Sequence, residues 1–65
     1  MNLKQLEAFV EVAEKNSFSK AAKSLYLTQP TVSAHISALE KELGSRLLIR
    51  NTKEVELSES GKRLY

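Results

Sequence analysis

The chain has 65 residues, enough for one domain with a small core, and 42% of them are hydrophobic. The absence of cysteine excludes a disulfide framework and a thiolate site, and it suits a reducing compartment. The net charge of +2 is a mild basic bias. No apolar run approaches the roughly 20 residues of a membrane span, and charges interrupt the first twenty residues. We therefore expect neither a span nor a signal peptide.

The charges are unevenly placed along the chain. Three glutamates, Glu7, Glu11 and Glu14, lie early, whereas most basic residues come later. A one-sided basic surface would favour a polyanion such as nucleic acid. A solvated surface of mixed charge is the alternative that composition alone leaves open.

The first predicted helix starts after Asn2, an N-cap residue that Gln5 complements as in a capping box. It ends near Lys15 or Asn16. Its apolar residues recur at helical spacing and define the expected inner face: Leu3, Leu6, Phe9, Val10 and Ala13.

Two further helices follow in quick succession. Ser17 can cap a short helix whose inner face includes the Ala21-Ala22 pair, small enough for another helix to cross closely. After a brief connection, Thr28 can cap a longer helix that Gly44 ends. The inner stripe of this third helix is formed by Val32, Ile36, Leu39 and Leu43.

Beyond Gly44 the pattern changes to that of a small β-hairpin. Residues 46–50 contain a run of strand formers, residues 51–53 are typical of a turn, and residues 54–57 alternate polar and apolar. Ser58 can cap a last helix that runs toward the end of the chain. The predicted fold is mainly α with one hairpin.

The outward face of the third helix is unusual, because no residue from Thr28 to Leu39 is charged. With the apolar stripe against the core, Pro30, Ala34, Ser37 and Lys41 point outward. Such short side chains let a helix backbone approach a partner closely, as reading base edges in the major groove requires. A short helix, a tight turn and this longer helix match the helix-turn-helix arrangement.

Other functions remain open at this point. The small face could join two helices in a protein–protein interface, and helix-turn-helix geometry also occurs outside DNA-binding proteins. Catalysis finds no support, because the two glycines are far apart and the serines lack a histidine constellation. The single His35 is expected to pack or cap, and no metal or cofactor is expected.

The segment SFSKAAKSLYLTQPTVSAHISALEKELGSRLLIR resembles the N-terminal DNA-binding domain of LysR-type bacterial transcriptional regulators. The resemblance covers essentially the whole chain at fixed spacing, and it rests on Phe18, Ala21, Ala22, Leu25, Gln29, Pro30, Ser33, Ile36, Leu39, Glu40, Leu43, Gly44, Leu47, Arg50, Leu57, Ser58 and Gly61.

This resemblance implies a winged helix-turn-helix in residues 1–58 and the start of a linker helix in residues 59–65. It implies a sequence-specific reader of double-stranded DNA in the bacterial cytoplasm, and no enzyme. Carried over by position, the third helix would face the major groove with Gln29, Pro30, Thr31, Ser33 and Ala34. Helical spacing adds Ser37 to the base-reading set. Backbone or minor-groove contacts would come from Phe18, Ser19, Lys20, Arg50 and Lys53.

The chain departs from the family's pattern at position 34, where Ala34 stands in place of a frequent long basic residue, and at position 48, where Leu48 replaces a frequent aromatic. The resemblance also implies an interrupted inverted-repeat operator and a homodimeric parent protein. Since the linker helix is short here, we expect a monomer or weak dimer with no small-molecule ligand. Mixed dimers with a longer relative are the rival expectation.

Overall fold

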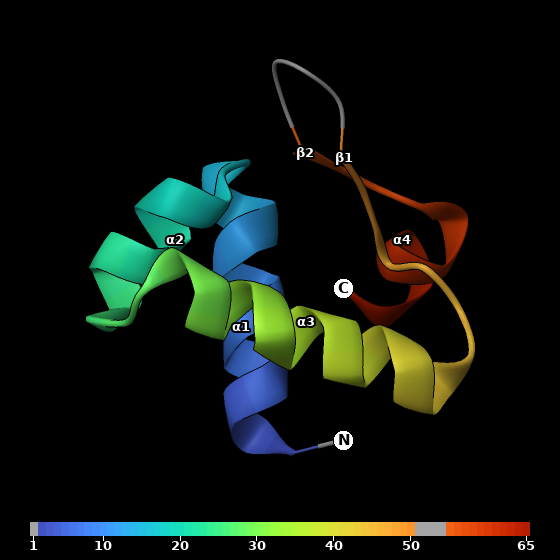
Figure 1. Cartoon of the computed structure of the whole chain (residues 1–65). Helices are drawn as coiled ribbons and strands as arrows, with labels where there is room; N and C mark the ends of the chain where they lie inside the picture. The colour runs from blue at the N-terminus through green and yellow to red at the C-terminus, as the bar shows by residue number, and fades with distance from the viewer. Residues whose placement is uncertain (1, 51–54) are drawn as a thin grey trace.

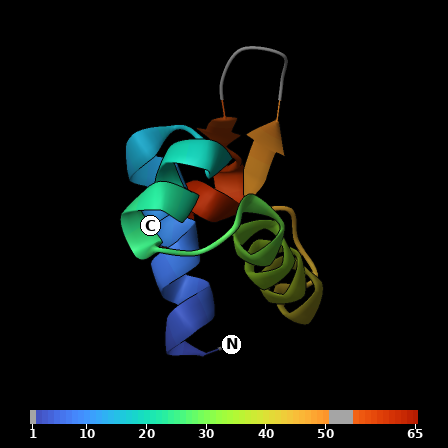
Figure 2. The ribbon, with the colours of Figure 1, turned by 60° about the vertical axis from the view of Figure 1, so that its left-hand side comes forward.

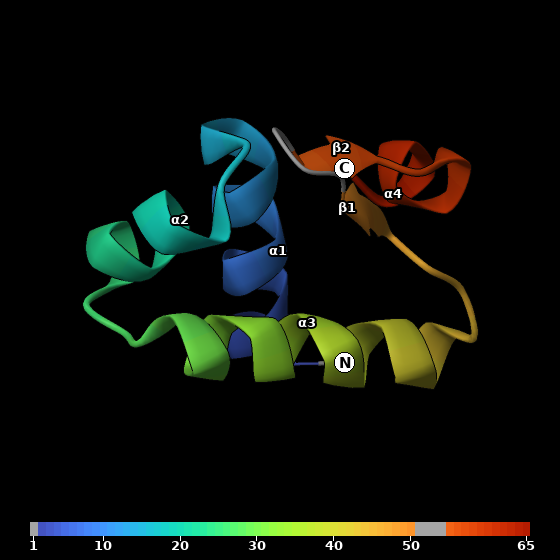
Figure 3. The same cartoon turned by 45° about the horizontal axis from the view of Figure 1, so that its top comes forward.

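A computed structural model describes residues 2–50 and 55–65, with the side chain of Arg50 left out. The element order is α1 (Leu3–Lys15), α2 (Phe18–Leu25), α3 (Gln29–Leu43), β1 (Leu48–Arg50), β2 (Val55–Leu57) and α4 (Glu59–Leu64). In Figure 3, α3 runs along the lower edge of the molecule, with α1 and α2 above its first half. The hairpin and α4 lie above its second half. The expected class, helices followed by a hairpin, is confirmed.

The predicted helix starts are confirmed, because each has a side-chain cap. Asn2 forms a full capping box with Gln5, while Ser17 and Thr28 accept the amides three residues on. These bonds satisfy amides that lack a partner in the first turn. Each of the three helices ends in a left-handed residue, of which only Gly44 avoids a steric penalty.

The core lies where α1, α2 and α3 meet, and Figure 2 shows α3 nearly end-on beside α1 and α2. Phe9, Ile36 and Leu39 are almost completely buried, and the Ala21-Ala22 pair is buried on α2, which packs against α3. The burial of these side chains stabilises the fold by roughly 1.5–3 kcal/mol for each large one. Leu47 and Leu48 extend the core under the hairpin.

The structure corrects two expected inner faces. On α1 the buried residues are Ala8, Phe9 and Val12, whereas Leu3 is 73% exposed and Val10 sits at the surface. At 100° per residue the buried arc is thus centred about 120° away from the predicted one, because Ala8 and Val12, which the prediction left out, face the core. On α3, Leu43 is exposed because the helix runs past the other helices before Gly44 ends it.

The hairpin is attached to α3 through one carboxylate. Glu40 Oε2 accepts the amides of Leu47 at 2.8 Å and Leu48 at 3.2 Å. The carbonyl of Leu47 in turn accepts the amide of Ser58 at 2.9 Å. Antiparallel pairing begins at Leu48, opposite Leu57, so Leu47, the first of the predicted strand formers, precedes the strand.

The start of α4 packs closely against the rest of the domain (Figure 1). Ser58 caps the helix, as predicted, by accepting the amide of Gly61. A Cβ built on Gly61 would lie 2.1 Å from the carbonyl oxygen of Leu47, so only glycine fits this approach. Tyr65 then reaches α1, with its ring edge-on to Phe9 at a centroid distance of 6.3 Å.

Candidate nucleic-acid interface

The outer face of α3 carries most of the predicted base-reading residues. Gln29, Pro30, Thr31, Ala34 and Ser37 are all exposed, while Ser33 is half-buried on the flank. Gln29 lies at the first position of the helix, so its side chain belongs to the N-terminal edge of this face. The helix thus presents short, uncharged side chains over three turns, as expected from the spacing.

Sequence reasoning missed one member of this face. Ala38 is exposed and stands one turn beyond Ala34. The same 100° spacing that selected Ala34 also selects Ala38, so the signal was available. We call the exposed set Pro30, Thr31, Ala34, Ser37 and Ala38 the outer face of α3.

The N-terminus of α3 has few free backbone amides. Pro30 has no amide proton, and the amide of Thr31 donates to Thr28 Oγ1 at 3.4 Å. The two threonine hydroxyls are also hydrogen-bonded to each other at 2.8 Å. This terminus therefore offers fewer amide donors to a phosphate than a helix N-terminus without a proline and a side-chain cap would.

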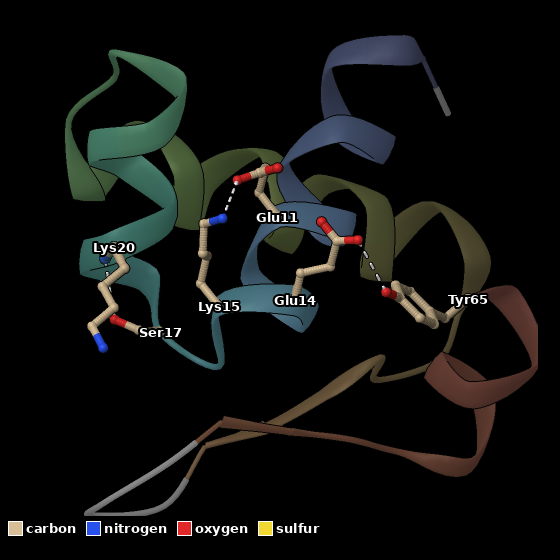
Figure 4. A network of polar contacts seen from close by, with 6 residues as sticks. All are labelled: Glu11, Glu14, Lys15, Ser17, Lys20 and Tyr65. Carbon is tan, nitrogen blue, oxygen red and sulfur yellow. Dashed lines mark hydrogen bonds and ion pairs between the residues drawn. The ribbon is translucent and has the colours of Figure 1, made fainter.

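The predicted backbone contacts at the start of α2 separate into two kinds. The side chain of Phe18 is buried in the core, at 8% exposure, so its ring cannot serve as a surface contact. Ser19 and Lys20 are exposed, and Ser17 Oγ accepts the amide of Lys20 at 3.1 Å (Figure 4). A phosphate contact here would depend on Ser19 and Lys20.

Only one of the two predicted wing residues lies in the part of the chain that the structure describes. Arg50 ends β1 and pairs with Val55, which places its backbone at the end of the hairpin away from α4. Lys53 lies outside the described residues. The other exposed basic residues of α2, α3 and the connection to β1 are Lys23, Lys41 and Arg46.

The turn before α3 holds a second residue that the sequence analysis passed over. Tyr26 is 95% exposed and has a left-handed backbone with φ of 59°. It ends α2 by donating its amide to the carbonyls of Ala22 and Lys23. A non-glycine residue costs roughly 1–2 kcal/mol in this conformation. The sequence offered no signal for it, since glycine or asparagine is usual at such a position.

His35 lines a surface depression of about 350 Å³ between α1, the end of α2 and α3. Its other lining residues are Lys4, Glu7, Leu25, Leu27 and Thr31. The expected packing role of His35 remains a prediction. Among residues 2–50 and 55–65, no group of three or more His, Cys, Asp or Glu side chains could hold a metal ion. No helix in this described part is long and apolar enough to cross a membrane.

Figure 4 shows polar contacts made by the second half of α1. Lys15 Nζ lies 3.9 Å from Glu11 Oε2, an i,i+4 ion pair on α1. The hydroxyl of Tyr65 donates to Glu14 Oε2 at 3.4 Å. Partial desolvation, together with the neighbouring Glu14 carboxylate, raises the pKa of Tyr65 above its usual value.

Helix packing, the short turn and the hairpin define a winged helix-turn-helix domain, and solved structures agree. The complex of the BenM DNA-binding domain with benA site 1 DNA superposes with a TM-score of 0.95 and 43% identity, covering 100% of this chain and 73% of that one. The complex of the CbnR DNA-binding domain with DNA superposes with a TM-score of 0.94 and 38% identity, covering 98% of this chain and 74% of that one.

Sequence comparisons give the family. The model for the bacterial regulatory helix-turn-helix proteins of the lysR family matches residues 3–62. An uncharacterized HTH-type transcriptional regulator of Azotobacter vinelandii is 52% identical over 98% of this chain and 44% of its own length. The HTH-type transcriptional regulator BudR of Raoultella terrigena is 46% identical over 100% of this chain and 22% of its own length.

The chain therefore belongs to the lysR family of bacterial regulatory helix-turn-helix proteins, and it is the DNA-binding domain of such a regulator. These relatives are transcriptional regulators, not enzymes. The chain spans less than half the length of these two curated relatives.

Proposed function

We propose that this domain binds double-stranded DNA sequence-specifically, with α3 in the major groove and the hairpin against the backbone or minor groove. The observation that supports it most is the outer face of α3, which is exposed over three turns and carries no charge. A helix with short side chains can approach base edges closely. Structural neighbours with about 40% identity were solved as DNA complexes.

The base-reading side chains we assign are Gln29, Pro30, Thr31, Ser33, Ala34 and Ser37. Phosphate affinity would come from Ser19 and Lys20, from the backbone near Phe18, and from Arg50 and Lys53. Phosphate contacts fix the register of the protein on the duplex, and base contacts select the sequence.

We further propose that two copies act together on an interrupted inverted repeat. One domain supplies few contacts, whereas two linked domains gain affinity through effective concentration. In the whole regulator, residues 59–65 would begin the linker helix that pairs the two domains. Its place of action would be the bacterial cytoplasm, where the chromosome lies. The isolated chain would be a monomer or a weak dimer.

The test is a salt series of fluorescence-anisotropy titrations with two labelled duplexes. One carries an AT-rich interrupted inverted repeat, and the other carries the same bases scrambled. Affinity for the repeat should exceed that for the scrambled duplex, and both should fall steeply with salt as counterions are released. Absence of binding to either duplex at low salt would contradict the proposal.

A protein–protein interface on the outer face of α3 is the competing function. Charge reversal at Arg50 and Lys53 separates the two. Arg50→Glu with Lys53→Glu should abolish DNA binding, because both substitutions place a negative charge near the phosphates. A protein partner that docks on α3 would be little affected by the same double variant.

A further inference from the structure

We infer that the outer face of α3 selects A·T pairs by contact with the 5-methyl group of thymine, and that Ala34 and Ala38 are the main specificity-determining residues. This inference rests on the proposed function. Family membership and the DNA complexes of similar domains support the proposed placement of α3 in the major groove. The chemistry of its exposed side chains then decides which base-pair edge it can recognise.

At Ala34 and Ala38 the outer face offers methyl groups where a reading helix usually offers hydrogen-bond donors, and Ser37 adds one hydroxyl. Ala34 and Ala38 are exposed and lie one turn apart, about 6 Å along the helix axis. Pro30 adds an apolar ring at the N-terminal end of the same face. In the major groove, the thymine methyl is the one apolar group on a base edge, and small apolar side chains contact it.

Thr31 contributes mainly its methyl group. Its hydroxyl oxygen is held at 2.8 Å from Thr28 Oγ1, and its amide donates to the same oxygen. The hydroxyl is thereby directed toward the helix cap. The methyl group is the part of this exposed side chain that the cap does not engage, and threonine methyls also contact thymine.

From Thr28 to Leu39 the same face lacks the groups that read guanine, and the exposed Lys41 lies beyond this stretch in the last turn of α3. Arginine and lysine donate in pairs to guanine O6 and N7, and glutamate or aspartate accepts from cytosine. No charged residue occurs from Thr28 to Leu39. The long polar side chain at the N-terminal edge is that of Gln29, whose amide suits adenine N6 and N7. Both kinds of contact therefore favour A·T pairs.

The experiment removes only the methyl group. Sites are first selected with the 65-residue chain from a randomised duplex library containing normal thymine. The enriched duplex is then resynthesised with deoxyuridine in place of thymine, one position at a time, and affinity is measured by anisotropy. Uracil keeps the Watson–Crick pairing and the O4 acceptor of thymine. Each contacted methyl should contribute roughly fourfold in Kd, the value for one buried methylene.

Variants assign the contact to a residue. The quantity compared is the Kd for the uracil duplex divided by the Kd for the thymine duplex. Ala34→Gly should bring this ratio toward one at the base position that Ala34 contacts, and Ala38→Gly should do so at a second position. Each ratio is taken within one variant, so a general loss of stability cancels. Ser24→Gly, on the exposed surface of α2, is the matched control and should keep the full ratio at every position.

A gain of function provides an independent test. Ala34→Arg introduces the two donors that guanine O6 and N7 accept. Repeating the selection with this variant should replace thymine with guanine at the position that Ala34 reads. Enrichment of the original sequence by both proteins would remove Ala34 from base reading.

The outcomes separate this inference from the proposed function. Failure to enrich any sequence would overturn both. Enrichment of A·T-rich sites whose affinity is unchanged by uracil would overturn the methyl contact alone, since such a preference would arise from minor-groove shape or duplex deformability. Position-specific loss with uracil that Ala34→Gly or Ala38→Gly suppresses is the result we expect.

Discussion

The two faces of α3 differ in almost every property although they share one helix. The inner face, Val32, Ile36 and Leu39, is completely buried, and its branched side chains are fixed by packing. The outer face is exposed and consists of side chains that make few contacts in the free domain. Stability and recognition are therefore carried by different residues, which can be altered independently.

A third side of the helix links these two roles. Glu40 lies between the faces and holds the beginning of the hairpin through its carboxylate. Substitutions on the inner face, at Glu40 and on the outer face should consequently have separable effects on folding, hairpin position and DNA affinity.

The largest effect is expected on the inner face. Ile36→Ala should lower the free energy of unfolding by about 2–5 kcal/mol, because it leaves a cavity beside Phe9 and Leu39. A domain of this size has roughly 3–10 kcal/mol in total. Urea unfolding followed by circular dichroism measures the change. Ser37→Ala is the control and should stay within about 0.5 kcal/mol; similar losses in both variants would refute the division into two faces.

Glu40→Ala should cost about 1–3 kcal/mol, because two backbone amides lose their acceptor. Glu40→Gln retains one acceptor oxygen and should lose clearly less. Urea unfolding gives the energies, and the NMR shifts of the Leu47 and Leu48 amides report the local change. An equal loss in the two variants would mean that the charge of Glu40 matters and its acceptor geometry does not.

Ala34→Asp tests the outer face alone. It should weaken DNA binding at least about tenfold, since a carboxylate would meet the electronegative groove. Stability should change by less than about 1 kcal/mol, the combined effect of helix propensity and exposure. Gln5→Glu makes the same change in net charge at the capping box of α1 and should leave affinity nearly unchanged. Equal weakening by both would indicate a long-range charge effect only.

The smallest effect concerns the contact between α4 and α1. Since the pKa of Tyr65 is raised in the folded state, its contribution to stability is full below the unfolded pKa near 10 and is lost as the pH rises through the folded value. A Tyr26→Phe background leaves Tyr65 as the one tyrosine for absorbance titration. Glu14→Gln should lower its pKa only in part, because desolvation is the larger cause.

The helix boundaries could be predicted because they depend on local chemistry. Caps at Asn2, Ser17, Thr28 and Ser58 and the stop at Gly44 each require only neighbouring residues, and all five are confirmed. The positions of the hairpin strands were predicted to within two residues for the described part. The domain boundary at residue 58 remains a prediction.

The errors arose where tertiary contacts decide. The buried arc of α1 was misplaced because Leu3 and Val10 fit a helical period yet face solvent. The role of Glu40 depends on amides seven and eight residues away, which helical periodicity does not reveal. Most of the outer face was predictable from spacing, except that Ala38 was overlooked. The burial of Phe18 follows from its inner position on α2 and limits its part in any phosphate contact.

The bonds from Glu40 to the hairpin are made entirely between groups of the domain itself. The conformational entropy lost in ordering residues 46–48 is therefore part of folding and is not added to the free energy of association. A domain whose hairpin is already ordered needs little rearrangement to bind DNA. The heat-capacity change of DNA binding should therefore reflect the buried contact area, without a large contribution from coupled folding. Calorimetry over a range of temperatures would reveal this thermodynamic signature.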